Sequence, residues 1–132
     1  MKFGIIKERK NPPDRRVVFI PDELARLKQL HQGISIKVES SDIRAFSDEE
    51  YKNMGIEVAN DISDCEVFFG VKEVPVENLI PNKSYFFFSH TIKKQPHNRK
   101  LLQSLLEKNI IFYDHETIVN SHNVRLIGFG KY

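Results

Sequence analysis

The sequence predicts an α/β sandwich with a mainly parallel sheet. Along the 132 residues, short apolar runs typical of strands alternate with amphipathic stretches typical of helices. Two runs, residues 67–71 and 85–88, are apolar throughout, as expected of central strands that are covered on both faces. The length suffices to bury a core without disulfides, and the only cysteine, Cys65, leaves none to form within the chain.

In the first half of the chain, turn and capping signals delimit the elements. Pro21-Asp22-Glu23 is typical of a helix start, because proline suits the first turn and carboxylates there favour the helix dipole. Ser47 followed by Glu50 predicts the capped start of a second, shorter helix. The expected elements are strands at residues 3–6, 34–38 and 56–59, and helices at residues 21–32 and 47–54.

The second half continues the alternation. Pro96 opens a helix whose leucines recur at the spacing of one buried face. After the two central strands we expect a helix at residues 96–109, a strand at 110–113, a polar hairpin-like tip at 120–123 and a last strand at 124–127. Because the sequence stops directly after this strand, we expect that a further segment is missing after Tyr132.

Composition and motifs exclude several classes of protein. A net charge of +2, with basic and acidic residues intermixed, is too small to indicate nucleic-acid binding. No segment resembles a signal peptide or could span a membrane, so we expect a cytoplasmic protein. His97, His115 and His122 match no zinc spacing, and no metal site is expected. Gly128 and Gly130 lack the third glycine of a dinucleotide fingerprint.

Ionisable residues follow both central strands. Lys72 comes directly after residues 67–71, and His90 comes two residues after 85–88. Ligands of open parallel sheets bind outside the carboxyl ends of the strands, so we expect both side chains at one sheet edge. A lysine and a histidine there can carry protons near neutral pH. The alternatives are a surface lysine paired with Glu73 and a structural histidine.

Other polar residues are candidates for binding an anionic substrate. Arg16 precedes an apolar run and Arg125 lies in the last expected strand, and a guanidinium can bind a carboxylate through two hydrogen bonds. Surface ion pairs are the alternative for both arginines. Lys93 and Gln95 precede the helix that Pro96 opens, whose free amides would favour an anion nearby.

Several blocks of the sequence resemble a known superfamily. They are Gly4-Ile5-Ile6-Lys7-Glu8-Arg9-Lys10-Asn11, Asp14-Arg15-Arg16-Val17 with Pro21, Gly70-Val71-Lys72-Glu73-Val74-Pro75, Phe87-Phe88-Ser89-His90-Thr91-Ile92-Lys93 with Gln95, and Tyr113-Asp114. The first two resemble the opening of the alanine dehydrogenase and transhydrogenase N-terminal domain. The other three are similar to its saccharopine-forming branch, which includes lysine-forming saccharopine dehydrogenase and lysine–2-oxoglutarate reductase. The resemblance covers essentially the whole chain.

The resemblance implies a three-layer Rossmann-like (flavodoxin-like) fold in a two-domain oxidoreductase. That enzyme would use NAD or NADP to couple lysine and 2-oxoglutarate to saccharopine, or run the reverse. Residues 1–132 would form its discontinuous substrate-binding and catalytic domain. A nucleotide-binding domain would follow the junction at residues 128–132, or a partner chain would supply it, and a homo-oligomer is a further expected form. Alone, the chain is expected to bind substrate weakly, to bind no cofactor and to catalyse nothing.

The resemblance also implies roles for particular residues. Lys72 and His90 align with a lysine and a histidine that act in acid–base catalysis at the imine or amine carbon. The residues expected to bind the substrate carboxylates or to line the same cleft are Arg16, Lys93, Gln95 and Arg125.

Departures from the family pattern leave other functions open. The segment at residues 19–21, Phe-Ile-Pro, replaces the more usual Leu-Thr-Pro, and no dinucleotide-binding domain is present in these 132 residues. One alternative is an alanine dehydrogenase that uses pyruvate and ammonia. The other is a free-standing, non-enzymatic module that binds an amino acid or docks on a partner protein.

Overall fold

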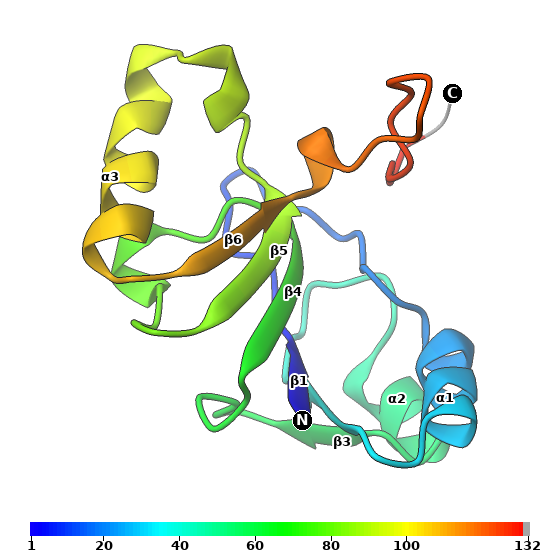
Figure 1. The fold of residues 1–132 in the computed structure, drawn as a ribbon. Helices are drawn as coiled ribbons and strands as arrows, with labels where there is room; N and C mark the ends of the chain where they lie inside the picture. The colour runs from blue at the N-terminus through cyan, green and yellow to red at the C-terminus, as the bar shows by residue number, and fades with distance from the viewer. Residues whose placement is uncertain (131–132) are drawn as a thin grey trace.

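The computed structural model describes residues 1–130 and contains a six-stranded parallel sheet with helices on both faces (Figure 1). The strand order is β3-β2-β1-β4-β5-β6, and every neighbouring pair is parallel. The strands are β1 (Lys2–Ile5), β2 (Ser35–Glu39), β3 (Glu57–Ala59), β4 (Val67–Lys72), β5 (Ser84–Phe88) and β6 (Ile111–Asp114). The helices are α1 (Pro21–Leu30), α2 (Asp48–Asn53) and α3 (Arg99–Glu107). The predicted α/β class and Rossmann-like arrangement are thus confirmed.

Lys131 and Tyr132, the last residues of the expected interdomain junction, lie outside the described residues. Within residues 1–130, no helix is long and apolar enough to cross a membrane.

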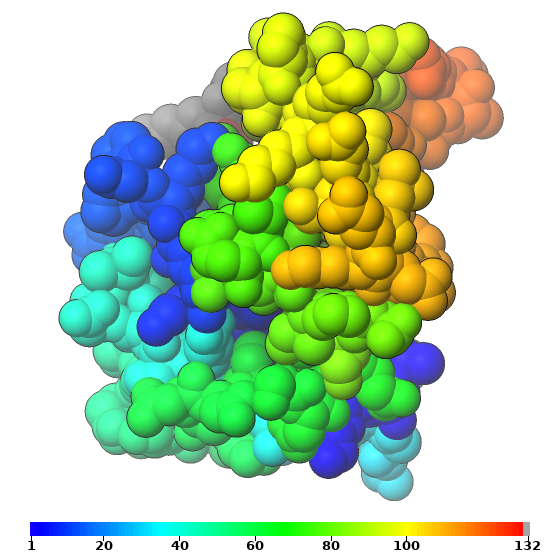
Figure 2. Space-filling view, turned by 90° about the vertical axis from the view of Figure 1, so that its left-hand side faces the viewer, coloured from blue at the N-terminus to red at the C-terminus, as the bar shows by residue number. Residues whose placement is uncertain are grey.

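Two apolar cores hold the layers together, one on each face of the sheet. On one face, Leu24 of α1 and Tyr51 of α2 pack against Ile5, Ile36 and Val38 of β1 and β2. The other core lies under α3 and consists mainly of Ile62, Cys65, Phe68, Val74, Leu79, Tyr85, Phe87, Leu101 and Leu105. Figure 2 looks onto this second face, where α3, in yellow and orange, lies beside the green segments around residues 60–80.

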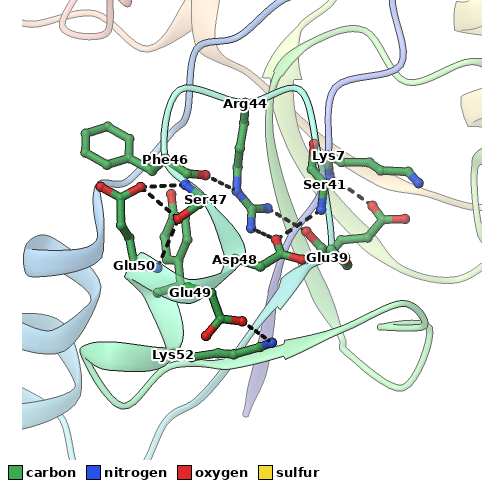
Figure 3. Close-up of polar contacts among 12 residues, drawn as sticks. Lys7, Glu39, Ser41, Arg44, Phe46, Ser47, Asp48, Glu49, Glu50 and Lys52 are labelled. Atoms are coloured by element: carbon green, nitrogen blue, oxygen red, sulfur yellow. Dashed lines mark hydrogen bonds and ion pairs between the residues drawn. The ribbon is translucent and has the colours of Figure 1, made fainter.

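The predicted capped start of α2 is confirmed in detail. The Ser47 hydroxyl accepts a hydrogen bond from the Glu50 amide at 3.3 Å, and the Glu50 carboxylate accepts one from the Ser47 amide at 2.6 Å (Figure 3). The preceding loop is fixed by Arg44, which pairs with Asp48 and donates to the Glu39 carbonyl at 2.6 Å. These contacts anchor the loop between β2 and α2 to the carboxyl end of β2.

One face of β4, β5 and β6 is less covered than predicted. Phe69, Phe86 and Tyr113 stack in a row across these three strands, with ring centroids 4.6 and 4.4 Å apart. Phe69 and Phe86 are only partly buried, and Tyr113 is 47% exposed. The prediction that both faces of the central strands are covered therefore holds for β4, where Phe69 packs against the core under α1 and α2, and is only partly met at Phe86 of β5. The physical reason is that the core under α1 and α2 reaches β4 and does not include β5 or β6, while α3 packs on the opposite face.

The predicted last strand at residues 124–127 does not form. Only one antiparallel bridge is present there, between Val119 and Arg125. The polar tip before it is confirmed, since the Asn120 amide donates to the Val124 carbonyl at 3.0 Å. The segment projects beyond β6 (Figure 1), and Leu126 is 62% exposed because no sheet edge lies against it.

The helix predicted from Pro96 begins three residues later. Residues Thr91–Lys93 and Pro96–Asn98 form two short 3₁₀ turns, and α3 starts at Arg99. The Asn98 side chain is buried and donates to the His90 carbonyl at 3.1 Å. This contact ties the turn that precedes α3 to the end of β5.

Candidate active site

The candidate site lies at the carboxyl edge of the sheet, where the strand order reverses. From β1 the chain builds the sheet outward through β2 and β3, and then returns to the other side of β1 with β4. Ligands of open α/β sheets bind in the crevice at such a switch point. The loop after β1, the end of β4 and the end of β5 all lie at this edge (Figure 1).

Lys72 and His90 follow neighbouring strands at this edge. Lys72 is the last residue of β4 and is paired in register with Phe88 of β5. His90 comes two residues after Phe88, and its ring stacks on the Phe88 ring at 6.4 Å. Both residues therefore lie at one edge of the sheet, as predicted.

Lys72 is held through its main chain. The two carboxylate oxygens of Glu8 accept hydrogen bonds from the amides of Val71, at 2.7 Å, and Lys72, at 2.9 Å. Glu73, expected as an alternative partner of Lys72, instead binds Lys10. Among residues 1–130 no carboxylate forms an ion pair with the partly buried Lys72.

Glu73 is a charged group between the two catalytic candidates. Burial disfavours its charged form, but hydrogen bonds from the Lys10 ammonium and from its own amide outweigh burial and lower its pKa. The positive charge of His90 acts in the same direction. The charge on Glu73 therefore interacts both with Lys10, in the loop after β1, and with His90, after β5.

His90 is fixed by an acidic partner and an unusual backbone. Its Nδ1 lies 3.1 Å from Oε2 of Glu116, and its side chain is 31% exposed. The backbone has φ = 59°, a left-handed conformation that costs a non-glycine residue free energy and persists only where the surroundings impose it. The contact with Glu116 holds the Nδ1 side of the ring.

Glu116 brings together three of the residues predicted from sequence. Besides His90, it binds the Arg125 guanidinium at 2.9 Å, and the Lys93 ammonium lies 3.7 Å away. Its side chain is only 7% exposed, and the Arg125 guanidinium also lies over the Phe88 ring at 5.7 Å. The sequence analysis missed Glu116, although the rule that located Lys72 and His90, applied to the end of β6, identifies it.

Arg16 is engaged within the chain. Its Nε and Nη2 donate to the Asp14 carboxylate at 2.9 and 2.5 Å, and its Nη1 donates to the Phe129 carbonyl at 3.2 Å. The hydrogen bond from Arg16 lowers the pKa of Asp14 against the effect of burial, and the nearby Lys72 ammonium adds to this. The predicted alternative of an ion pair is thus present, and a substrate carboxylate would have to replace Asp14 or Phe129 on Arg16.

Gln95 lies apart from the other candidate residues. It lies at the start of the second 3₁₀ turn, exposed, beside a surface hollow of about 340 Å³ that Lys94, Arg99 and Leu102 also line. The structure therefore gathers Lys93, His90 and Arg125 around Glu116, sets Lys72 and Arg16 around Glu8 and Asp14, and leaves Gln95 apart.

The gathered groups suit an anionic substrate that exchanges protons. Arginines and a lysine that can bind carboxylates lie in the same groups as a lysine and a histidine that can carry protons. Within the described part of the chain, no group of three His, Cys, Asp or Glu side chains is arranged to hold a metal ion. The sequence contains no complete G-x-G-x-x-G motif for a dinucleotide phosphate.

Comparison with known proteins agrees with the fold. Residues 4–132 match the family described as alanine dehydrogenase/PNT, N-terminal domain. The chain belongs to this family. This alanine dehydrogenase/PNT N-terminal domain is 40% identical over 98% of its length to alpha-aminoadipic semialdehyde synthase of Arabidopsis thaliana, and 36% identical over 98% to the mitochondrial protein of that name from Bos taurus. It spans 12% and 14% of those relatives.

One further relative and one solved structure are also similar to the domain. Saccharopine dehydrogenase [NAD(+), L-lysine-forming] of Yarrowia lipolytica is 26% identical over 90% of the domain, which spans 33% of that protein. Among solved structures, an L-alanine dehydrogenase superposes with a TM-score of 0.77 over 94% of the domain, at 22% identity and 35% of the other chain. At that identity the likeness shows the fold alone.

Proposed function

We propose that this domain binds the substrate and supplies the acid–base groups of an NAD(P)-dependent oxidoreductase that forms or cleaves saccharopine. The observation that carries the proposal is the similarity, over 98% of the chain, to proteins named alpha-aminoadipic semialdehyde synthase. The relative from Yarrowia lipolytica, whose name specifies NAD(+) and L-lysine formation, supports the same substrate class. The reaction would couple lysine and 2-oxoglutarate, or run in reverse.

The chemistry of the site is consistent with this substrate. Saccharopine carries several carboxylates and a secondary amine, so it requires cations to bind it and groups that move protons at the amine. Arg16, Arg125 and Lys93 would bind the carboxylates. Lys72 and His90 would activate water at the imine carbon and protonate the amine, which imine hydrolysis requires.

The hydride carrier would be bound outside this chain. Without a complete dinucleotide fingerprint, the residues present do not fit NAD or NADP. We propose that a second domain or a partner chain binds the cofactor, and that the 132-residue chain alone catalyses no turnover. The row of partly buried Phe69 and Phe86 and exposed Tyr113 supports a discontinuous domain, because a later segment of a longer protein would cover it. A homo-oligomer in the cytoplasm is the proposed setting.

Substrate preference tests the proposal. In the longer protein that combines this domain with a nucleotide-binding domain, NADH or NADPH oxidation would be measured with lysine plus 2-oxoglutarate and, separately, with pyruvate plus ammonium. We expect kcat/KM to be about 100-fold higher or more for the first pair, because a site built for carboxylates leaves charges unpaired with a smaller substrate. A preference for pyruvate and ammonium would assign the domain to an alanine dehydrogenase. Absence of turnover with both pairs would favour a binding module.

A further inference from the structure

We propose that Glu8 is a positioning residue: its carboxylate takes the place of a missing strand beside the end of β4 and thereby holds Lys72 at the site. The inference rests on the proposed function, because it presupposes that Lys72 acts on the substrate. Glu8 itself is assigned no contact with substrate. It acts through the main chain of Val71 and Lys72.

The first observation is where the sheet ladder stops. The last main-chain hydrogen bond between β1 and β4 runs from the Ile6 amide to the Phe69 carbonyl, at 3.0 Å. Beyond it, the Glu8 carboxylate accepts both following amides that face it, those of Val71 at 2.7 Å and Lys72 at 2.9 Å. The Glu8 carboxylate thus serves as the hydrogen-bond acceptor for the end of β4, as the main chain of β1 does for the preceding residues.

The second observation is that β4 is irregular at this point. In a regular strand, successive amides point to opposite neighbours, so one carboxylate cannot accept from both. The pairing of β4 with β5 shifts register between Phe69 and Lys72, as at a β-bulge, a device that redirects side chains next to active sites. The bulge aims two consecutive amides at Glu8, and the carboxylate is the only acceptor for both among the described residues.

The bulge is also held from the other side. The Gly70 carbonyl accepts a hydrogen bond from Nε2 of His115 at 3.1 Å, which fixes the proton of the neutral ring on Nε2. Burial lowers the pKa of His115, whose exposure is 2%. A Cβ at position 70 would lie 2.8 Å from the terminal side-chain carbon of Ile6, so glycine here lets Ile6 pack directly against the strand.

The loop that carries Glu8 is anchored on both sides of that residue. The Lys7 amide donates to the Glu39 carboxylate at 2.9 Å (Figure 3), and Arg9 pairs with the other oxygen of Glu39. Lys10 binds Glu73, just beyond Lys72. Because its neighbours are fixed to β2 and to the chain after β4, Glu8 is directed at the bulge.

The two amides favour the charged form of Glu8. Burial, with the nearby Asp14 charge, raises the pKa of this carboxyl group above its ordinary value, and the hydrogen bonds from Val71 and Lys72, with the Arg16 charge, limit that rise. A glutamine at this position offers a single oxygen and turns its NH₂ group toward the second amide. Glu8→Gln therefore removes one of the two contacts and leaves the volume of the side chain almost unchanged.

A double-mutant cycle tests the inference in the longer enzyme, with whichever substrate pair it turns over. Glu8→Gln should lower kcat about tenfold when Lys72 is present, because a misplaced catalytic group loses rate while substrate binding is kept. In the Lys72→Met background the same change should lower kcat by less than about twofold, because the group that Glu8 positions is gone. KM should remain within about twofold in both backgrounds.

A matched control separates positioning from general stability. Glu66→Gln changes a carboxylate that also accepts a main-chain amide of a neighbouring strand, that of Lys2 at 2.8 Å, but at the opposite edge of the sheet. It should leave kcat unchanged. If Glu8→Gln does not fold, Glu8→Asp, which keeps the charge on a shorter side chain, replaces it in the cycle under the same criteria.

The outcomes distinguish this inference from the proposed function. Equal losses of kcat from Glu8→Gln in both backgrounds, or no loss in either, would overturn the positioning role. Normal turnover in Lys72→Met alone would instead overturn the role of Lys72 and with it the proposed function. A loss confined to the background that retains Lys72 supports both.

Discussion

Replacing Lys72 by methionine should lower kcat of the longer enzyme about 100-fold or more, the size of a general acid–base contribution. Methionine keeps the length and apolar stem of the side chain but cannot carry a proton. Lys72 is partly buried at the end of β4, and its main chain is held by Glu8, so the substitution should leave the backbone in place. Steady-state kinetics with lysine and 2-oxoglutarate measure the effect.

The control for this variant is Lys28→Met. Lys28 lies on α1, away from the carboxyl edge of the sheet, and its ammonium donates to the Gly55 carbonyl at 2.8 Å. Its replacement removes the same charge and should change kcat by less than about twofold. If Lys72→Met also stays within that range, Lys72 is not an acid–base group of the enzyme.

Glu116→Ala should lower kcat about 10- to 100-fold, because three candidate site cations lose their common partner. The carboxylate contacts the His90 ring and the Arg125 guanidinium and lies near the Lys93 ammonium. Without it, the strained backbone of His90 loses the contact that orients its ring, and the cations repel one another. Kinetics of the longer enzyme, together with urea unfolding of the same variant, separate loss of activity from loss of stability.

Glu116→Gln is the matched variant for this prediction. It keeps an oxygen that can accept a hydrogen bond from Arg125 or His90 but removes the negative charge. We expect a smaller loss than for Glu116→Ala, since part of the geometry is retained. Equal activity of the native protein and Glu116→Ala would show that the cluster around Glu116 does not orient the reacting groups.

The sequence was sufficient to locate the edge of the sheet at which the candidate residues meet. Apolar runs that end in Lys72 and shortly before His90 predicted two neighbouring parallel strands, and parallel strands carry their carboxyl ends to one edge. Glu116 follows β6 in the same way, but the short run before it, with Tyr113 and Asp114, gave a less distinct strand end. The strand was predicted to end at residue 113, and Glu116 was assigned no role.

Contacts between distant segments were beyond the reach of sequence patterns. Arg16 contacts the Phe129 carbonyl, 113 positions along the chain, and Glu8 contacts the amides of residues 63 and 64 positions away. Neither periodicity nor capping signals encode such pairs, because they depend on how loops close over the assembled sheet. The register shift in β4 is likewise not indicated by any sequence pattern.

The absence of the predicted strand at residues 124–127 also has a physical reason. Residues 124–127 are apolar enough to read as a strand, but a strand needs a neighbour with free main-chain groups. β6 is the edge strand of the sheet and has a free side, but the segment projects beyond the carboxyl end of β6 and forms one bridge with Val119 instead. Strand propensity alone could not reveal that this segment does not run alongside β6.

The most direct test of the central claim, that Lys72 and His90 meet one substrate, is a titration of the 132-residue chain with saccharopine followed by backbone amide NMR. The account predicts weak binding, with a dissociation constant on the order of 1 mM, and concerted shifts at Lys72, His90, Lys93 and Arg125. Alanine at the same concentration should shift them less. Shifts confined to the apolar face between α1 and the sheet, or shifts at Lys72 without any at His90, would contradict it.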